Sequence, residues 1–256
     1  EKQVGVSVVM VGGSQMGRIR EELEVVGKGR VEVVGFVKSH GKAEVKRISS
    51  ALKELAQAGK KPDVVLIGGP SNSMVEHGKD GSRGYQPERS VKVRSDMGKS
   101  RQEWEVKYHM TDPRRISMSE KRTLVDKVAE MVQDASRVFP RAEIGYVTMF
   151  PRHVRKCCEE HMTDEDVVMT DGIRREVDRD VKELVREKDG SVSFLEWWEL
   201  LGLEGDMTVD ESRRMGIVGS DGVHLTDKAN GNAALSICHR YARTGAAECG
   251  RKRMRW

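Results

Sequence analysis

Short apolar runs rich in β-branched residues alternate along the chain with longer amphipathic stretches, and this alternation limits the fold more than any other feature. Such a pattern is typical of βαβ units on a parallel sheet. We therefore predict a three-layer α/β/α sandwich, in which helices cover both faces of a central parallel sheet of about five strands. The strands are expected at residues 5–11, 31–37, 63–67, 143–149 and 191–195. The main helices are expected at residues 15–26, 43–58, 117–139, 164–188 and 227–243.

The chain is long enough for one large domain with a buried core. It has 256 residues, of which 37% are hydrophobic and 34% are charged, so the core must be concentrated in the apolar runs. We predict a single domain at residues 1–245, with an insertion at about residues 77–112, and a basic tail or linker at residues 246–256. The longest apolar run, "VGVSVVMVGG", is about half as long as a membrane span, so no transmembrane helix is predicted.

The cysteine content and the net charge bear on the cellular compartment of the protein and on its binding partners. The four cysteines form no CxxC pair, which argues against a disulfide framework, and the chain shows no signal peptide. We therefore expect an intracellular protein, cytoplasmic or nuclear, and the start at Glu1 predicts a piece of a longer polypeptide. The net charge of +4 is accompanied by 41 acidic residues, so global charge alone does not predict nucleic-acid binding.

Two segments do not fit the alternating pattern. Residues 77–112 are rich in Gly, Ser, Lys and Arg. A long segment of this kind is either a surface insertion without a role in the chemistry or a lid or binding arm over the site. The C-terminal "CGRKRMRW" is either a charged tail or a basic patch that links to a following domain.

The stretch "VMVGGSQMG" at residues 9–17 follows the first predicted strand and contains the first candidate for chemistry, Ser14. It lacks the Gly-Lys-Ser/Thr ending of a P-loop, and Met16 occupies the last glycine position of the motif GxSxG. In the dinucleotide-binding motif GxGxxG, Ser14 replaces the second glycine, and Lys38 lies where an acidic residue is wanted. Nucleotide binding therefore stays open only as an alternative. Ser14 itself is a helix N-cap, a nucleophile, or both.

A second stretch, "DGVHLT" at residues 221–226, supplies the partners that a nucleophilic serine needs. Asp221 and His224 are separated by two residues, so a short turn presents both to one site, where His accepts the serine proton and Asp holds the imidazole. The stretch leads into a predicted helix whose expected N-cap is Thr226 or Asp227. Because α/β folds form their sites at the carboxyl edge of the sheet, Ser14 and His224 are expected to meet there.

The chain resembles the SGNH, or GDSL-type, hydrolase family over nearly its whole length. Four blocks carry the resemblance, in the family's order. They are "VVMVGGSQMGRI" with Ser14, "VEVVGFVKSHGKA" with Gly41, "PDVVLIGGPSNSM" with Asn72, and "DGVHLT" with Asp221 and His224. The resemblance implies the flavodoxin-like sheet of these hydrolases.

The same resemblance implies a reaction at a carboxylic ester. Ser14 would be the nucleophile, His224 the general base and Asp221 the residue that orients His224. The N–H groups of Ser14 and Gly41 and the amide of Asn72 would form the oxyanion hole. The expected substrate is a small acyl ester, in acetyl or short-chain form, and it would be cleaved without a cofactor or a metal ion.

The chain is also similar, more loosely, to the esterase domains in first-open-reading-frame proteins of LINE-type retrotransposons. This similarity implies an alternative function as a catalytically weak, SGNH-like interaction module of a larger nucleic-acid-associated protein. Nucleic acid would then bind through flanking domains or through the basic segments.

Two further clusters have more than one interpretation. In "PRHVRKCCEEHMTDED", a helix would align His153, Cys157 and His161 as metal ligands, but surface histidines and a buried cysteine explain the same spacing. In "FLEWWELLG", Trp197 and Trp198 are expected to be one core and one surface indole, with a carbohydrate-stacking platform as the alternative.

Overall fold

A five-stranded parallel sheet lies at the centre of the computed structural model, which describes residues 5–39, 43–71, 86–96, 99–109, 118–152, 164–188 and 191–242. The strand order is β2-β1-β3-β6-β7, and every pairing is parallel. The strands are β1 (Val6–Gly12), β2 (Val31–Lys38), β3 (Val64–Gly68), β6 (Glu143–Val147) and β7 (Ser193–Leu195). The predicted sheet and all five predicted strands are confirmed.

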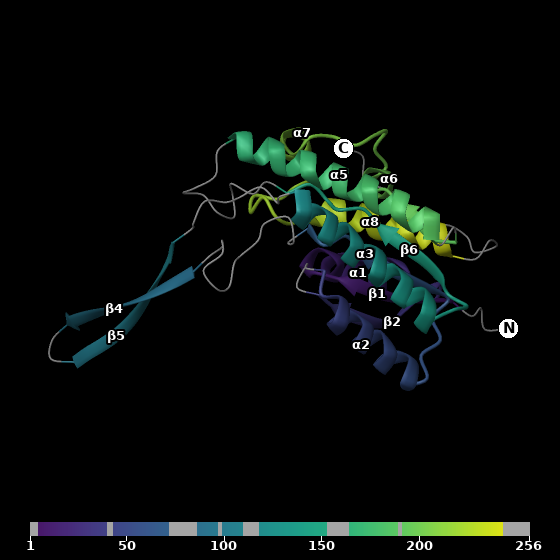
Figure 1. Ribbon diagram of the computed structural model, residues 1–256, viewed down its shortest axis with the longest axis horizontal. Helices are drawn as coiled ribbons and strands as arrows, with labels where there is room; N and C mark the ends of the chain where they lie inside the picture. The colour runs from purple at the N-terminus through teal and green to yellow at the C-terminus, as the bar shows by residue number, and fades with distance from the viewer. Residues whose placement is uncertain are drawn as a thin grey trace.

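Helices cover both faces of this sheet (Figure 1), as the alternating pattern predicts. One face packs against α1 (Ser14–Val26), α6 (Trp197–Leu201) and α8 (Asp227–Tyr241). The other packs against α2 (Val45–Gln57), α3 (Met118–Val138) and α5 (Asp164–Lys188). A short helix, α7 (Val209–Arg214), precedes the loop that enters α8. The three-layer architecture is therefore confirmed.

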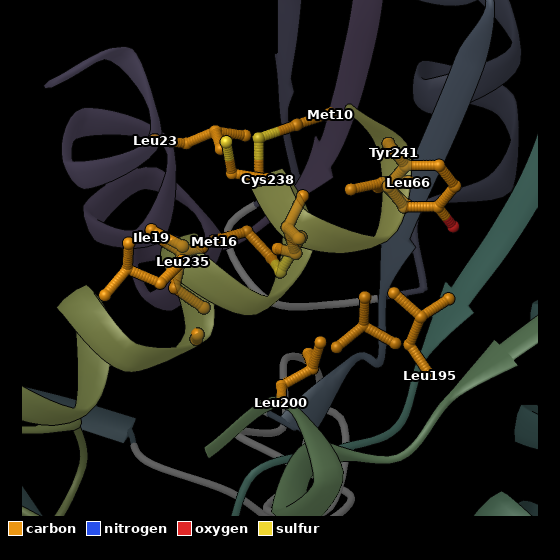
Figure 2. Close-up of a cluster of buried hydrophobic side chains, with 14 of the residues drawn as sticks. Met10, Met16, Ile19, Leu23, Leu66, Leu195, Leu200, Leu235, Cys238 and Tyr241 are labelled. Atoms are coloured by element: carbon orange, nitrogen blue, oxygen red, sulfur yellow. The ribbon is translucent and has the colours of Figure 1, made fainter. Parts of the chain in front are cut away.

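The first strand shows how the sequence supports two cores. Val8 and Met10 belong to the cluster on the α1 and α8 side, and Val9 and Val11 belong to the cluster on the α2 and α3 side. Successive side chains point to opposite faces, so a strand buried on both faces needs a nearly continuous apolar run. Figure 2 shows the first cluster, where side chains from the sheet, α1 and α8 interlock.

The order in which the chain connects the strands determines where a site can form. The chain passes from β1 to β2 at one side of β1 and then returns to β3 at the other side. In open α/β sheets, the carboxyl ends of two strands that diverge in this way border a crevice. Residues that directly follow β1 and β3 are therefore brought together at this edge.

Gly12 lets the end of β1 lie directly against the first turn of α1. A Cβ at Gly12 would lie 2.6 Å from Met16 Cβ and closer still to Met16 Cγ. Because Met16 Cβ is attached to the helix backbone, rotation of the side chain cannot relieve this overlap. The glycine is thus required by a close approach that fixes where α1 begins.

Gly12→Ala is expected to lower the free energy of unfolding by about 1–3 kcal/mol, since the added methyl group overpacks a buried contact. Urea denaturation followed by circular dichroism measures this change. Gly172→Ala is the control, because Gly172 lies within α5 and a methyl group added there would meet no described atom within 4 Å. There the substitution is expected to stabilise by about 0.5–1 kcal/mol, as alanine favours a helix. Equal effects at the two positions would contradict this account of Gly12.

Residues 77–112 contain regular structure that the sequence analysis did not predict. β4 (Gln86–Asp96) and β5 (Lys99–His109) pair antiparallel in a separate two-stranded sheet, which lies apart from the five-stranded sheet in Figure 1. The register places Val91 opposite Trp104 and Arg89 opposite Val106. Whether this hairpin acts as a lid or as a surface insertion stays a prediction.

The cysteine expectation is wrong at one position. Cys238, which is buried in α8, takes part in a disulfide. The other three cysteines lie outside the described residues. Sequence spacing offered no signal for this bond, because disulfide formation depends on the distance between two cysteines in the fold.

Candidate active site

Ser14 is the first residue of α1, at the carboxyl end of β1. The N-cap of α1 is Gly13, whose backbone is extended, and no side chain caps this helix end in the described part of the chain. The interpretation of Ser14 as the N-cap is therefore wrong. The N–H groups at the start of a helix have no partner within the helix, so those of the first turn of α1 can donate to a bound group.

The hydroxyl of Ser14 contacts the imidazole of His224. Ser14 Oγ lies 2.7 Å from His224 Nε2, and His224 Nδ1 lies 2.7 Å from Asp221 Oδ2. The serine and the histidine are 210 residues apart in the sequence. The structure thus brings together, in one hydrogen-bonded line, the three side chains that the two separate motifs predict.

The spacing of Asp221 and His224 follows from the geometry of their turn. Asp221 Oδ1 accepts hydrogen bonds from the backbone N–H groups of Val223 and His224, both at 2.9 Å, while Oδ2 binds the imidazole. The turn requires a positive φ at Gly222, where φ is 67°. One carboxylate therefore both closes the turn and orients the ring. This double role requires two residues between Asp221 and His224, one of them a glycine.

The charge of Asp221 fixes the tautomer of His224. Partial burial by itself raises the pKa of Asp221, but hydrogen bonds from the backbone and ring of His224 and from Val223 outweigh it and lower this pKa to about 2. An ionised carboxylate only accepts hydrogen bonds, so His224 Nδ1 carries the proton and Nε2 presents its lone pair to Ser14. This is the arrangement in which a histidine can take the proton of a serine.

A small pocket opens beside Ser14 Oγ. As bounded by the described residues, it holds about 20 Å³ of space, which is roughly the volume needed for one water molecule. Its lining comes from the first turn of α1, from the ends of β1, β3 and β6, and from the loop before α8. The lining residues are Gly13, Ser14, Gln15, Met16, Gly68, Gly69, Ser71, Phe150, Val223 and His224.

Comparison with protein-family models gives no match, and neither does comparison with curated protein sequences. Solved structures do match, over 93% of this chain in each of three cases. A lipolytic protein of the G-D-S-L family from Veillonella parvula is 11% identical and is covered over 100% of its length, with a TM-score of 0.50. The family 3 carbohydrate esterase from Clostridium thermocellum is 13% identical and is covered over 100%, with a TM-score of 0.50. A lipase from a goat rumen metagenome is 12% identical and is covered over 99%, with a TM-score of 0.52.

The chain has the SGNH hydrolase fold. The predicted fold class is thereby confirmed, including the flavodoxin-like order of the strands. Dinucleotide-binding domains instead have the strand order 3-2-1-4-5-6. The sheet therefore does not have the strand order of the dinucleotide-binding alternative, because β1 here lies between β2 and β3 and no strand continues the sheet beyond β2 in the described residues.

Of the three residues predicted for an oxyanion hole, only Ser14 lies within the described residues. Gly41 and Asn72 lie outside the described residues, so their roles stay predictions. Ser14 is placed, and its backbone N–H belongs to the first turn of α1. The positive end of a helix dipole favours negative charge at that position.

The sequence analysis missed the residues that complete the pocket from the neighbouring strands. Gly69 and Ser71 follow β3, and Phe150 follows β6. Their position directly after predicted strands could have revealed them, because residues that follow parallel strands converge at one edge of the sheet.

A buried polar network supports the pocket at the end of β6. Asp178 accepts hydrogen bonds from Tyr146 Oη at 2.9 Å and from the Met149 N–H at 3.0 Å. Complete burial raises the pKa of Asp178 to about 7, although Arg174 and the two hydrogen bonds act in the opposite direction. A Cβ on Gly69 would lie 3.0 Å from Tyr146 Oη. The network therefore packs directly against the pocket-lining glycine and supports it from within the core.

The described part of the chain does not test the metal hypothesis. Among those residues, no group of three or more His, Cys, Asp or Glu side chains could hold a metal ion. His153, Cys157 and His161 lie outside the described residues, so their role is untested.

Trp197 lies in the core, as predicted for one member of the tryptophan pair, and Trp198 packs partly buried against the same core cluster. Trp197 is fully buried and donates from Nε1 to Asp206 at 2.9 Å. Trp198 is half-buried, with Lys182 Nζ 5.7 Å from its ring. An indole that lies wholly in the core cannot form half of a carbohydrate-stacking platform.

Two further expectations concern a membrane span and nucleic-acid binding. Over the residues that the structure describes, no helix has the length and apolarity that crossing a membrane requires. Of the segments expected to bind nucleic acid, residues 246–256 lie outside that part of the chain, and residues 86–96 and 99–109 are described by their strand pairing. Nucleic-acid binding therefore stays a prediction.

Proposed function

We propose that this protein is a serine esterase that hydrolyses acetyl and other short-chain acyl esters. The observation that carries the proposal is the hydrogen-bonded line from Ser14 Oγ to His224 Nε2 and from His224 Nδ1 to Asp221 Oδ2, each link at 2.7 Å. Further support comes from the fold, which is shared with a carbohydrate esterase and with a lipase.

The first half of the reaction forms an acyl-enzyme. Ser14 Oγ attacks the ester carbonyl carbon while His224 Nε2 takes the hydroxyl proton, and Asp221 stabilises the resulting imidazolium. His224 then gives this proton to the alcohol oxygen as the carbon–oxygen bond breaks. The alcohol leaves, and the acyl group stays on Ser14.

The second half repeats the chemistry with water. His224 Nε2 takes a proton from a water molecule, whose oxygen attacks the acyl carbon of the Ser14 ester. The proton returns to Ser14 Oγ as that ester breaks, and the carboxylic acid leaves. In both halves, negative charge develops on the former carbonyl oxygen, which the Ser14 N–H and the end of α1 would stabilise. Gly41 and Asn72 are proposed to add two further donors.

The size of the pocket supports a short acyl chain. The space beside Ser14 amounts to about 20 Å³, and Met16 and Phe150, which line it, are both buried. Within the space that the described residues bound, a long aliphatic chain would have to displace Met16 or Phe150. An acetyl group adds one methyl carbon to the carbonyl and needs the least displacement.

The test is the hydrolysis of p-nitrophenyl esters of increasing chain length. We expect release of p-nitrophenol from the acetate, with kcat/KM falling by about tenfold or more between acetate and octanoate, since overpacking typically costs about 1–3 kcal/mol and about 1.4 kcal/mol corresponds to tenfold in rate. A fluorophosphonate probe should attach to Ser14, as located by peptide mass spectrometry. Release no faster than in buffer, together with no labelling at Ser14, would refute the proposal.

A further inference from the structure

The side chain of Gln15, the residue after Ser14, reaches the backbone beside His224. Gln15 Oε1 accepts a hydrogen bond from the N–H of Leu225 at 2.8 Å. Two adjacent residues of α1 therefore contact two adjacent residues of the loop before α8, since Ser14 binds His224 and Gln15 binds Leu225. A pair of parallel contacts resists rotation of the loop, which a single contact between Ser14 and His224 does not.

Asn230 closes this contact into a ring. Its Nδ2 donates to the carbonyl oxygen of Leu225 at 3.2 Å, and its Oδ1 accepts from Gln15 Nε2 at 2.5 Å. Both backbone groups of Leu225 are thus bound by side-chain amides, and the two amides bind each other. Asn230 and Leu225 are each 2% exposed, so the bond between them is shielded from competing water, while Gln15 is half-buried.

The backbone of Leu225 dictates the orientation of both amides. Its N–H requires an acceptor, which places the oxygen of Gln15 there and turns the nitrogen of Gln15 toward Asn230. Its carbonyl requires a donor, which places the nitrogen of Asn230 there and leaves the oxygen of Asn230 to accept from Gln15. All three hydrogen bonds of the ring can form together only when both amides have this orientation.

Other backbone groups of the loop before α8 also form hydrogen bonds, but these bonds do not reach α1. The His224 carbonyl accepts from the Gly219 N–H at 2.7 Å, and the Thr226 N–H donates to the Ile217 carbonyl at 2.9 Å. These two bonds hold the loop to the segment that precedes it. The bond from Leu225 to Gln15 instead joins the loop backbone to the helix that carries Ser14.

We propose that Gln15 and Asn230 are positioning residues that set the distance and angle between Ser14 Oγ and His224 Nε2. This inference rests on the proposed esterase function, because it assigns them an effect on proton transfer in that reaction. Both act through the backbone of Leu225 and not on the reacting atoms. Their contribution is to keep the imidazole within hydrogen-bond reach as the serine oxygen moves toward the substrate.

Gln15→Met tests the proposal, since methionine has a similar length and flexibility but offers no strong acceptor to Leu225. We expect kcat for p-nitrophenyl acetate to fall by about 10- to 100-fold, because a misplacement of the order of 1 Å costs about that much. KM should change by less than about threefold, since the amide of Gln15 is engaged by Leu225 and Asn230 and not by the ester. Gln57→Met, at the exposed end of α2, is the matched control and should keep full activity.

Gln15→Glu separates positioning from general stability. Its carboxylate still accepts from the Leu225 N–H but cannot donate to Asn230, so kcat should lie between that of the wild type and that of Gln15→Met. The rate of Ser14 labelling by the fluorophosphonate should follow the same order in all three proteins. A kcat within twofold of the wild type in folded Gln15→Met, or a loss that appears only in KM, would overturn the inference. A Gln15→Glu protein that folds and is no better than Gln15→Met would also overturn it.

The two proposals fail in different ways. A wild-type protein that neither releases p-nitrophenol nor reacts with the probe refutes the esterase function and this inference with it. If the wild-type protein is active and Gln15→Met is equally active, only the role of the ring is refuted.

Discussion

Ser14→Ala is expected to reduce kcat for p-nitrophenyl acetate by about four to six orders of magnitude. The substitution removes the hydroxyl oxygen that lies 2.7 Å from His224 Nε2. Without it, no acyl-enzyme forms. Steady-state release of p-nitrophenol measures the loss, and labelling by the fluorophosphonate should disappear at the same time.

The matched control is Ser50→Ala. Ser50 is an exposed serine of α2, and its hydroxyl donates to Glu54 at 3.3 Å on the helix surface. This variant should keep the wild-type kcat and KM. Because Ser14 is exposed and does not cap α1, Ser14→Ala should also keep the wild-type melting temperature to within a few degrees. Turnover in Ser14→Ala that matches the wild type would rule out the proposed nucleophile.

Asp221→Asn is expected to lower kcat by about four orders of magnitude while leaving the turn folded. The asparagine oxygen can still accept from the N–H groups of Val223 and His224, as Asp221 Oδ1 does. The asparagine nitrogen, however, faces His224 Nδ1 as a donor. The imidazole then holds its proton on Nε2, where it can no longer take a proton from Ser14.

Titration of Asp221 itself should add no pH dependence to this loss between about pH 5 and about pH 8, because the pKa of Asp221 is about 2 and the wild-type carboxylate stays ionised throughout. Because the pKa of Asp221 is lower in the folded state, its ionised carboxylate stabilises the fold at every pH above the ordinary pKa of an aspartate. This stabilisation is lost as the pH falls from that ordinary pKa toward 2. Asp227→Asn, in the exposed first turn of α8, is the control and should keep nearly full activity. A kcat for Asp221→Asn within tenfold of the wild type would show that Asp221 does not orient His224.

Periodicity predicted the regular elements well where they are long or buried on both faces. Five strands and five helices were placed to within a few residues, because their apolar patterns reflect burial that each element undergoes in the fold. The hairpin of β4 and β5 was missed, although Val91 and Val93 alternate with polar residues as in a strand. The high content of charged and small residues in this segment hid that alternation. The helices α6 and α7 have five and six residues, too few to show a helical period.

The sequence by itself determined which side chains could take part in the proposed chemistry. Ser14 follows a buried strand, and the spacing of Asp221 and His224 is the spacing at which one carboxylate closes a turn and holds a ring. Both facts are local, so they can be read from neighbouring residues. The parallel sheet then places both motifs at one edge.

Only the tertiary structure decided how these side chains meet. The role of Ser14 as an N-cap or as a partner of His224 depended on a contact across 210 residues, which no local pattern encodes. The ring of Gln15, Leu225 and Asn230 depended on the packing of α1 against α8, because its hydrogen bonds join residues of both helices and of the loop that enters α8. Distances between side chains that are remote in sequence are set by packing and not by motif, which is why the sequence indicated the proposed nucleophile but not the residues proposed to position its base.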